Sequence, residues 1–234
     1  MPQGFSIAID GPVASGKGTT AAALADKLGG FFINTGGMYR AVALFCIERG
    51  IDVNDEVKVT NILPEVNIEV KDRKILLNGN DVTERIKEPD TSDGSSIVAV
   101  YGSVRVALVE KQREIGQKVV DQSKAVIAEG RDAGTKIFPE AALKIFLTAS
   151  MEVRVKRRQA QEKAKGRVRE ISELVEDIEI RDKRDKGRII DPLSSDPKRD
   201  GYWVLDNSGQ TPEQTAEVIM RELVRKGLIK DDQN

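Results

Sequence analysis

Short apolar segments alternate with longer segments of helical periodicity along most of the chain. Five of the apolar segments have the length and composition of strands, and helical stretches separate them. This alternation is typical of a parallel sheet whose strands are connected by helices, so the sequence predicts an α/β fold. The expected strands cover residues 5–9, 31–33, 125–128, 143–147 and 202–205.

The helical stretches carry capping signals. One helix is expected to begin after Ser150, a good N-cap, and it places Arg154 and Arg158 on one face because they are four residues apart. The last helix is expected to begin with a capping box formed by Thr211 and Gln214. The other expected helices cover residues 16–28, 37–49, 104–122 and 172–187.

Between residues 63 and 85 the pattern changes to an alternation of apolar and polar residues. Turn signals lie at residues 71–73 and 78–80, so this segment predicts a small antiparallel β insertion. Its charged residues are expected to face solvent, and nothing in it indicates catalysis.

The helix expected at 172–187 has one unusual face. Leu174, Ile178, Arg181, Asp185 and Arg188 fall on one stripe that begins apolar and ends charged. This pattern indicates a helix that leaves the core and enters a polar cleft, where the arginines could hold an anion and the aspartate could accept a hydroxyl proton. A ladder of surface salt bridges remains an alternative explanation of the same spacing.

Composition narrows the class of protein. A length of 234 residues suits one substantial domain, or one core with an insertion. The 37 basic and 38 acidic residues give a net charge of -1, which argues against a general nucleic-acid-binding surface. No apolar segment approaches membrane-spanning length, and the only cysteine, Cys46, is expected in the core. We therefore expect a soluble, cytoplasmic and monomeric protein.

The chain contains no histidine, which excludes catalysis and metal sites that depend on imidazole. Phosphoryl transfer remains possible because it relies mainly on positioning and on cations that stabilise charge.

A phosphate-binding loop follows the first expected strand. The segment GPVASGKGT matches the G-x-x-x-x-G-K pattern, with a strand before it and a helix after it. Its glycines let backbone N–H groups converge on an anion, and the helix N-terminus adds partial positive charge. Lys17 could reach the β- and γ-phosphates of ATP. The loop residues are Gly11, Pro12, Val13, Ala14, Ser15, Gly16, Lys17, Gly18 and Thr19.

The loop departs from the general pattern at one position. Gly18 follows the lysine where Ser or Thr usually binds Mg²⁺, and the hydroxyl comes one residue later at Thr19. This G-K-G-T loop resembles that of the nucleoside monophosphate kinases. The resemblance implies that Mg²⁺ is held largely by nucleotide phosphates and water, with no direct protein ligand required and with Thr19 and Glu129 as possible contacts.

Four further segments extend this resemblance. They are NTGGMYR (34–40), SSIVAVYGSVR (95–105), EGRDAGT (129–135) and RDKRDKGR (181–188), and together with the loop they resemble the bacterial cytidylate kinase family over nearly the whole chain. The resemblance implies a three-layer P-loop fold with a five-stranded parallel sheet, in which the β insertion forms a CMP-binding domain and a short lid closes the cleft. The implied parts are a core (1–36, 102–150 and 188–234), a CMP-binding domain (37–101) and a lid (151–187).

The resemblance also implies residue roles for the transfer of phosphate from ATP to CMP or dCMP. Lys17, Arg131 and Arg158 would be catalytic; Arg154 would stack on adenine, and Arg158 would act with a basic lid segment at 163–169 over the ATP phosphates. Arg40, Arg131 and Thr35 would hold the acceptor phosphate, a task that suits multi-donor guanidinium groups. Arg181 and Asp185 would contact the ribose, and Tyr39 could line the base site. The cytosine edge would be read by Ser96, Arg105, Asp132 and Arg188.

Two positions depart from the family pattern. Asn34 and Glu129 each stand where an aspartate is usual. Glu129 keeps the charge and could organise metal-bound water, whereas Asn34 loses a charge near the phosphate site.

Two other functions remain open from the sequence alone. One is a kinase for another acceptor, such as UMP or a non-nucleotide alcohol. The other is a nucleotide-dependent switch or binding module; the lack of an N-K-x-D guanine-reading motif and the second arginine-rich segment argue against it.

Overall fold

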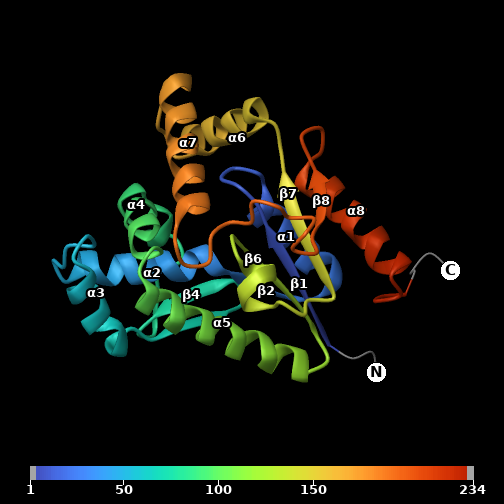
Figure 1. Ribbon diagram of the computed structural model, residues 1–234, viewed down its shortest axis with the longest axis horizontal. Coiled ribbons are helices and arrows are strands. Elements are labelled where there is room, and N and C mark those ends of the chain that lie inside the picture. The colour runs from blue at the N-terminus through green and yellow to red at the C-terminus, as the bar shows by residue number, and fades with distance from the viewer. Residues whose placement is uncertain (1–3, 231–234) are drawn as a thin grey trace.

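The computed structural model describes residues 4–230 and contains the expected parallel sheet (Figure 1). Its five strands lie in the order β2-β6-β1-β7-β8, and every neighbouring pair is parallel. Residues 1–3 and 231–234 of the expected core lie outside the described residues. The strands are β1 (Phe5–Asp10), β2 (Phe31–Asn34), β6 (Ala125–Gly130), β7 (Leu143–Thr148) and β8 (Trp203–Asp206).

Helices cover both faces of this sheet, because side chains of each buried strand point alternately to the two sides. Ile7 and Ile9 of β1 pack with α1 (Lys17–Leu28) and α8 (Pro212–Arg225) on one face. Ala8, between them, faces α5 (Gly102–Asp121) and α2 (Thr35–Glu48) on the other. The predicted three-layer α/β fold is therefore confirmed.

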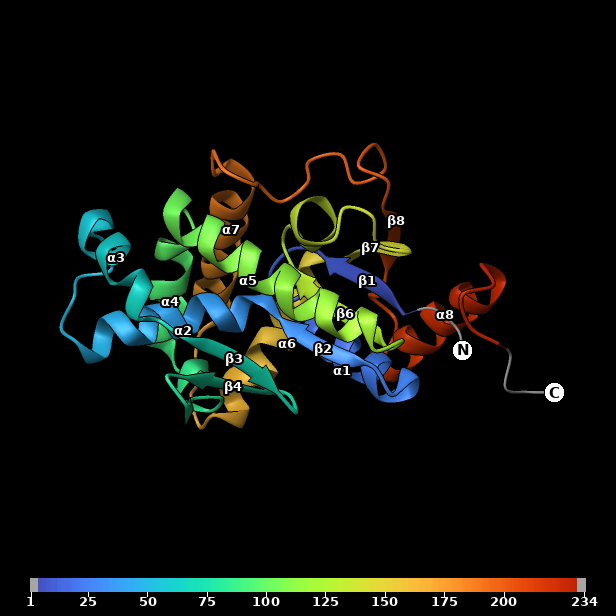
Figure 2. The ribbon, with the colours of Figure 1, turned by 90° about the horizontal axis from the view of Figure 1, so that it is seen from below.

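The β insertion packs against α2. Its strands form an antiparallel sheet, in which Asp72, Arg73, Asn78 and Gly79 all have positive φ at the two expected turns. Figure 2 shows α2 between α5 and this small sheet. The predicted antiparallel insertion is confirmed, but two helices in this region were not predicted. The elements are α3 (Glu56–Ile62), η1 (Leu63–Glu65), β3 (Ile68–Lys71), β4 (Lys74–Leu77), β5 (Asn80–Asp81), η2 (Arg85–Lys87) and α4 (Pro89–Val98).

Two consecutive helices, α6 (Met151–Ala164) and α7 (Ile171–Gly187), project beyond the sheet and cross each other (Figure 1). Leu174 and Ile178 are fully buried, and they form a small apolar cluster with Val155 and with Val13 of the phosphate loop. The stripe on α7 therefore begins in an apolar cluster beside the loop, which confirms that this face does not point to solvent.

The remaining features agree closely with the sequence pattern. Helices expected at 16–28, 104–122 and 172–187 begin and end within two residues of α1, α5 and α7, and Thr211 and Gln214 form the expected capping box. Cys46 is buried and free. Within residues 4–230, no helix is both long and apolar enough to cross a membrane.

Candidate active site

The loop between β1 and α1 is shaped by two glycines. Gly16 has φ 86° and is the residue that precedes α1, a left-handed conformation that other residues adopt at a cost. A Cβ on Gly11 would lie 2.1 Å from the Leu147 carbonyl oxygen of the neighbouring strand. The loop can therefore pass close to the sheet and deliver its backbone to the N-terminus of α1, as a phosphate site requires.

Lys17 lies at the start of α1 and is almost entirely buried. Its Nζ donates a hydrogen bond to the Pro12 carbonyl oxygen at 3.1 Å, and none of the carboxylates in the described part of the chain lies within ion-pair distance of it. Burial, followed by the charge of Arg131, lowers the pKa of Lys17 from 10.5 to about 7. The lysine is thus a poorly compensated cation that an incoming phosphate would stabilise.

Side chains of α6 and α7 hold the phosphate loop in place. Asp182 of α7 accepts a hydrogen bond from the Val13 amide at 3.0 Å and forms an ion pair with Arg154, whose Nε donates to the Val13 carbonyl at 2.7 Å. Arg154 is buried and is not among the cleft-lining residues, so in this structure it contacts the loop rather than an open base site. No local sequence pattern indicates Asp182 as the partner of Arg154.

Arg157, which the sequence left without a role, lies on the other side of the loop. Its Nη1 donates to the Ser15 carbonyl at 2.8 Å and to the Asn207 side chain at 3.1 Å. This guanidinium group therefore connects the phosphate loop to the segment between β8 and α8.

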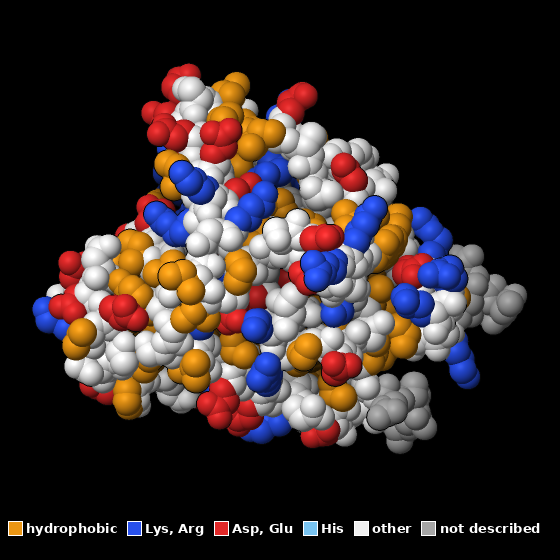
Figure 3. Space-filling view, viewed as in Figure 1, with side chains coloured by type: hydrophobic (Ala, Val, Ile, Leu, Met, Phe, Trp, Pro, Cys, Tyr) orange, Lys and Arg blue, Asp and Glu red, His pale blue; other side chains and the backbone are white. Residues whose placement is uncertain are grey.

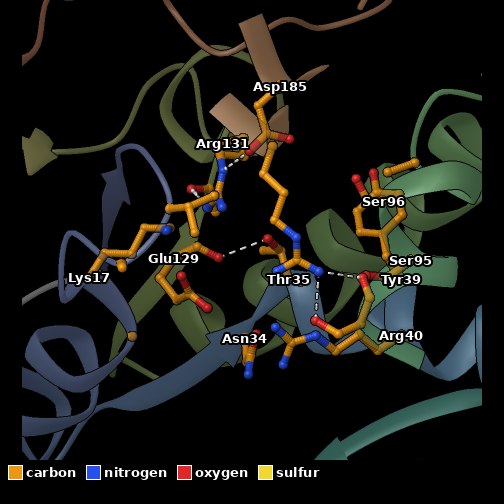
Figure 4. Close-up of a pocket in the computed structure, with 18 of the residues that line it drawn as sticks. Lys17, Asn34, Thr35, Tyr39, Arg40, Ser95, Ser96, Glu129, Arg131 and Asp185 are labelled. Carbon is orange, nitrogen blue, oxygen red and sulfur yellow. Dashed lines mark hydrogen bonds and ion pairs between the residues drawn. The ribbon is translucent and has the colours of Figure 1, made fainter. Parts of the chain in front are cut away.

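A cavity of about 510 Å³ extends from the loop toward α4, a size that suits small-ligand sites. Figure 4 shows Lys17 and Ser96 on opposite sides of it, with Glu129 and Thr35 between them. Among the expected loop residues, Gly11, Pro12 and Ser15 lie behind the surface of the cavity. Every expected acceptor-site residue lines it: Thr35, Tyr39, Arg40, Ser96, Arg105, Arg131, Asp132, Arg181, Asp185 and Arg188.

Two arginines provide positive charge at the centre of the cavity. Arg131 follows β6, and its Nε forms an ion pair with Asp185 of α7 at 2.5 Å. Burial alone would raise the pKa of Asp185, but Arg131 outweighs it and the pKa is lowered, so the pair stays ionised. Arg40 of α2 has no ion-pair partner among the described residues, and burial lowers its pKa. The centre of the cavity is therefore suited to a doubly charged anion.

The far end of the cavity contains a buried carboxylate. Asp132 forms an ion pair with Arg105 and lies 3.7 Å from Nη2 of Arg188, an atom that has no hydrogen-bond partner in the structure. Arg105 also pairs with Asp191 at 3.0 Å and lies over the ring of Tyr39, 5.6 Å from its centroid. This arrangement offers a carboxylate acceptor and an unused guanidinium donor side by side.

Serines of α4 complete the wall opposite the loop. Nη2 of Arg181 donates to both the carbonyl and the hydroxyl of Ser92 at 2.9 Å, and Arg184 donates to the hydroxyl of Ser96 at 2.6 Å. Neither Ser92 nor Arg184 was expected to contact the site, because their proximity depends on how α4 packs against α7.

The residues near the loop fit a metal that is carried by phosphates. The Thr19 hydroxyl donates to the Gly16 carbonyl at 2.9 Å within its own helix, while Glu129 lies 3.7 Å from the position that a Cβ on Gly18 would take. No three carboxylate or thiolate side chains within residues 4–230 are close enough together to hold a metal ion. Thr19 and Glu129 both line the cavity beside the loop, where they could contact a metal or its water ligands.

A buried carboxylate on α6 joins two arginines that line the cavity. Glu162 of α6 is only 4% exposed, and it pairs with Arg158 at 3.1 Å and with Arg167 at 2.7 Å. Arg167 also reaches Glu88 before α4 at 3.5 Å. Figure 3 shows Lys and Arg side chains gathered at the foot of the projecting α7. The connector between α6 and α7 therefore lines the cavity and reaches the residue directly before α4.

Comparisons with known proteins agree with this geometry. The family model described as cytidylate kinase matches residues 7–225. A cytidylate kinase of Leuconostoc mesenteroides is 40% identical over 88% of this chain and 91% of its own length, and one of Bacillus licheniformis is 38% identical over 97% and 99%. A solved structure of an uncharacterized protein from Eubacterium ventriosum shares the fold, with a TM-score of 0.54, 11% identity and coverage of 94% and 98%. The chain therefore belongs to the cytidylate kinase family and is a nucleoside monophosphate kinase that uses ATP.

Proposed function

We propose that the protein transfers the γ-phosphoryl group of ATP to CMP and dCMP, with Mg²⁺ bound to the nucleotide phosphates. The observation that carries this proposal is the cavity itself: it joins a phosphate loop with a nearly uncompensated lysine to a second group of arginines and a buried carboxylate. One cavity with two anion sites suits a reaction between two nucleotides.

The carboxylate supports cytosine as the acceptor base. Asp132 can accept a hydrogen bond from the 4-amino group, while the free Nη2 of Arg188 can donate to an acceptor on the same base. Uracil has a carbonyl in place of that amino group, so two hydrogen-bond acceptors, the carbonyl and the buried carboxylate, would face each other. Failing to satisfy such a group typically costs about 1–3 kcal/mol, which is enough to discriminate between the two bases.

The phosphate of the acceptor would lie between Arg40 and Arg131, close to Thr35. Because the second pKa of a phosphate monoester is about 6, this group is largely dianionic near neutral pH and needs no strong general base. An oxygen of the CMP phosphate forms a bond to the γ-phosphorus of ATP in line with the breaking bond to the β–γ bridging oxygen, and ADP leaves. Lys17, Arg131 and Arg158 would compensate the charge on the transferred group.

Mg²⁺ would neutralise charge on the nucleotide phosphates when it is bound, and Glu129 would hold its water ligands. The segment carrying Arg158 and Arg167 would exclude water from the closed cavity and so limit hydrolysis of ATP. Arg181 and Asp185 would contact the ribose. We propose that Arg154 supports the donor site by holding the loop through Val13.

We propose that the enzyme is monomeric and cytoplasmic. Its only cysteine, Cys46, is buried and forms no disulfide, which suits a reducing compartment.

An acceptor panel tests the proposal. ADP formation from ATP·Mg²⁺ is measured in a coupled assay with CMP, dCMP, UMP, AMP and shikimate at equal concentrations. We expect kcat/KM to be highest for CMP and dCMP, and lower for UMP by about 10-fold or more, as the loss of one buried hydrogen bond implies. A preference for UMP would contradict the role of Asp132, and tight ATP binding without acceptor-dependent ADP formation would support a switch instead.

A further inference from the structure

Asp10 has a fully buried carboxylate that does not line the cavity. Asp10 is the last residue of β1, directly before the phosphate loop, and none of its side chain is exposed. Its Oδ1 accepts a hydrogen bond from the Ala133 amide at 2.9 Å, and its Oδ2 accepts from the Gly134 amide at 2.8 Å and from the Tyr202 hydroxyl at 2.6 Å. All its partners are neutral donors.

These partners come from two distant parts of the chain. Ala133 and Gly134 begin the one-turn π-helix η3 (Ala133–Ile137), which directly follows Arg131 and Asp132. Tyr202 directly precedes β8. Its hydroxyl can reach Asp10 because residue 134 is a glycine: a Cβ at Gly134 would lie 2.8 Å from the Tyr202 hydroxyl oxygen. The carboxylate thus joins the end of β1, the turn after β6 and the start of β8.

We propose that Asp10, completed by Tyr202, is a positioning residue that fixes the acceptor-site pair Arg131 and Asp132 relative to the phosphate loop. Asp10 itself is covered by protein and contacts neither nucleotide. The proposal rests on the proposed function, because it assigns the CMP site to the residues that Asp10 positions.

The chemistry of the contact supports this role. Three donors converge on one carboxylate, and hydrogen bonds to a charged acceptor are stronger and more directional than neutral ones. They act on the two residues immediately after Asp132, so a small rotation of the turn would move both Arg131 and Asp132. The η3 turn is a short π-helix, an irregular conformation that is often found at functional sites.

The protonation state of Asp10 makes this role measurable. Burial raises its pKa from 3.8 to about 6, although Tyr202 and the two amides lower it and Asp132 raises it further. The other charged groups near this contact are Lys17, which Asp10 influences, and Lys144, whose Nζ lies 5.7 Å from the Tyr202 ring centroid. Protonation of Asp10 removes an acceptor from the Gly134 amide or from Tyr202, so CMP binding should weaken as the pH falls through about 6.

Tyr202→Phe tests the proposal with little change of shape. KM for CMP and for ATP and kcat are measured between pH 5.5 and 8.5. Tyr101→Phe serves as the control because it removes a hydroxyl whose hydrogen bond, to the Val53 carbonyl between α2 and α3, involves neither Asp10 nor η3. We expect Tyr202→Phe to raise KM for CMP about 5- to 10-fold at pH 6.5, with KM for ATP changed less than 2-fold. In the wild type, CMP binding should weaken on the acid side of the pH profile. In Tyr202→Phe this weakening should begin about one pH unit higher, because loss of one donor raises the pKa of the Asp10 carboxyl by about that amount.

The ionisation of CMP itself is the same for every variant, so a difference between their profiles reports the protein. Asp10→Asn should raise KM for CMP more strongly than Tyr202→Phe does. It should also lack the weakening of CMP binding at low pH that protonation of Asp10 causes in the wild type. Trp203, the only tryptophan, is adjacent to Tyr202, and its fluorescence should show the same shift in titrations without substrate.

Unchanged KM for CMP and an unchanged pH profile in Tyr202→Phe would overturn the proposal, as would equal losses for ATP and CMP. A wild-type enzyme that forms no ADP with CMP would instead contradict the proposed function, so the two failures can be told apart.

Discussion

Lys17 gives the most direct test of how the phosphate loop balances stability against catalysis. Its ammonium group is buried and donates one hydrogen bond, to the Pro12 carbonyl, and it forms no ion pair within residues 4–230. Replacement of Lys17 by Met keeps a side chain of similar length and removes the charge. We expect the variant to be more stable than the wild type without nucleotide and to be nearly inactive.

The structure sets the magnitude. A pKa lowered from 10.5 to about 7 corresponds to roughly 4–5 kcal/mol of unfavourable free energy for the charged form. Water that enters the cleft and the lost hydrogen bond to Pro12 reduce the gain, so we expect an increase of about 1–3 kcal/mol in the free energy of unfolding. For a chain of this length, that is a rise in Tm of about 3–10 °C.

The pH dependence has a definite sign. The unfolded chain holds a proton on Lys17 up to about pH 10.5, whereas the folded chain releases it near pH 7. The destabilisation by Lys17 is therefore complete below about pH 7 and disappears as the pH rises through 10.5. The difference in Tm between Lys17→Met and the wild type should be largest near pH 6.5 and should shrink by pH 9.5.

Thermal unfolding with and without ATP·Mg²⁺, combined with the coupled ADP assay, measures each part. The control is Lys27→Met, which removes a partly exposed lysine from the same helix and should change Tm little. ATP should stabilise the wild type and the control but not Lys17→Met, and kcat of Lys17→Met should fall by at least about 10²-fold. A variant less stable than the wild type, or a difference independent of pH, would refute the reasoning about burial; near-normal turnover would refute the catalytic role of the loop.

Three further changes separate the parts of the site. Glu162→Gln removes the buried carboxylate shared by Arg158 and Arg167, so kcat should fall about 10-fold in the coupled assay. Glu152→Gln on the exposed part of the same helix should be neutral. Asp182→Asn weakens the contact that holds the phosphate loop, and steady-state kinetics should show a larger rise in KM for ATP than for CMP. Gly116→Ala should lower the free energy of unfolding by about 1–3 kcal/mol in urea titrations, because its Cβ would lie 2.2 Å from the Phe138 ring.

The features predicted from the sequence are those that depend on neighbours along the chain. The strands and the phosphate loop carry local patterns, and the resemblance supplied residues that the structure brings into one cavity. Helix α4 was missed because its sequence, PDTSDGSSIV, is poor in helix-forming residues. It is stabilised by packing on α2, where a Cβ on Gly94 would lie 3.1 Å from the Ala43 side chain, and such a contact leaves no local pattern.

The partners of individual side chains were the least predictable part. Arg154 was expected to face adenine, but the position of Asp182 on α7 brings it to the Val13 carbonyl instead. Tyr202 was assigned only to the strand expected at 202–205, and its hydroxyl donates to Asp10, 192 residues earlier in the chain. An apolar or charged residue type predicts burial or exposure, but the partner is determined by the three-dimensional arrangement of elements far apart in sequence.

The two departures from the family pattern illustrate the same limit. In the sequence, Asn34 and Glu129 are unrelated; in the sheet they lie opposite each other on adjacent strands, β2 and β6. Asn34 still caps α2, because its Oδ1 accepts a hydrogen bond from the Gly37 amide at 2.8 Å, a contact for which an amide serves as well as a carboxylate. The loss of charge at Asn34 therefore leaves the helix start intact. Because Glu129 opposite it keeps its charge, the change at Asn34 alone reduces like-charge repulsion where the phosphates would bind.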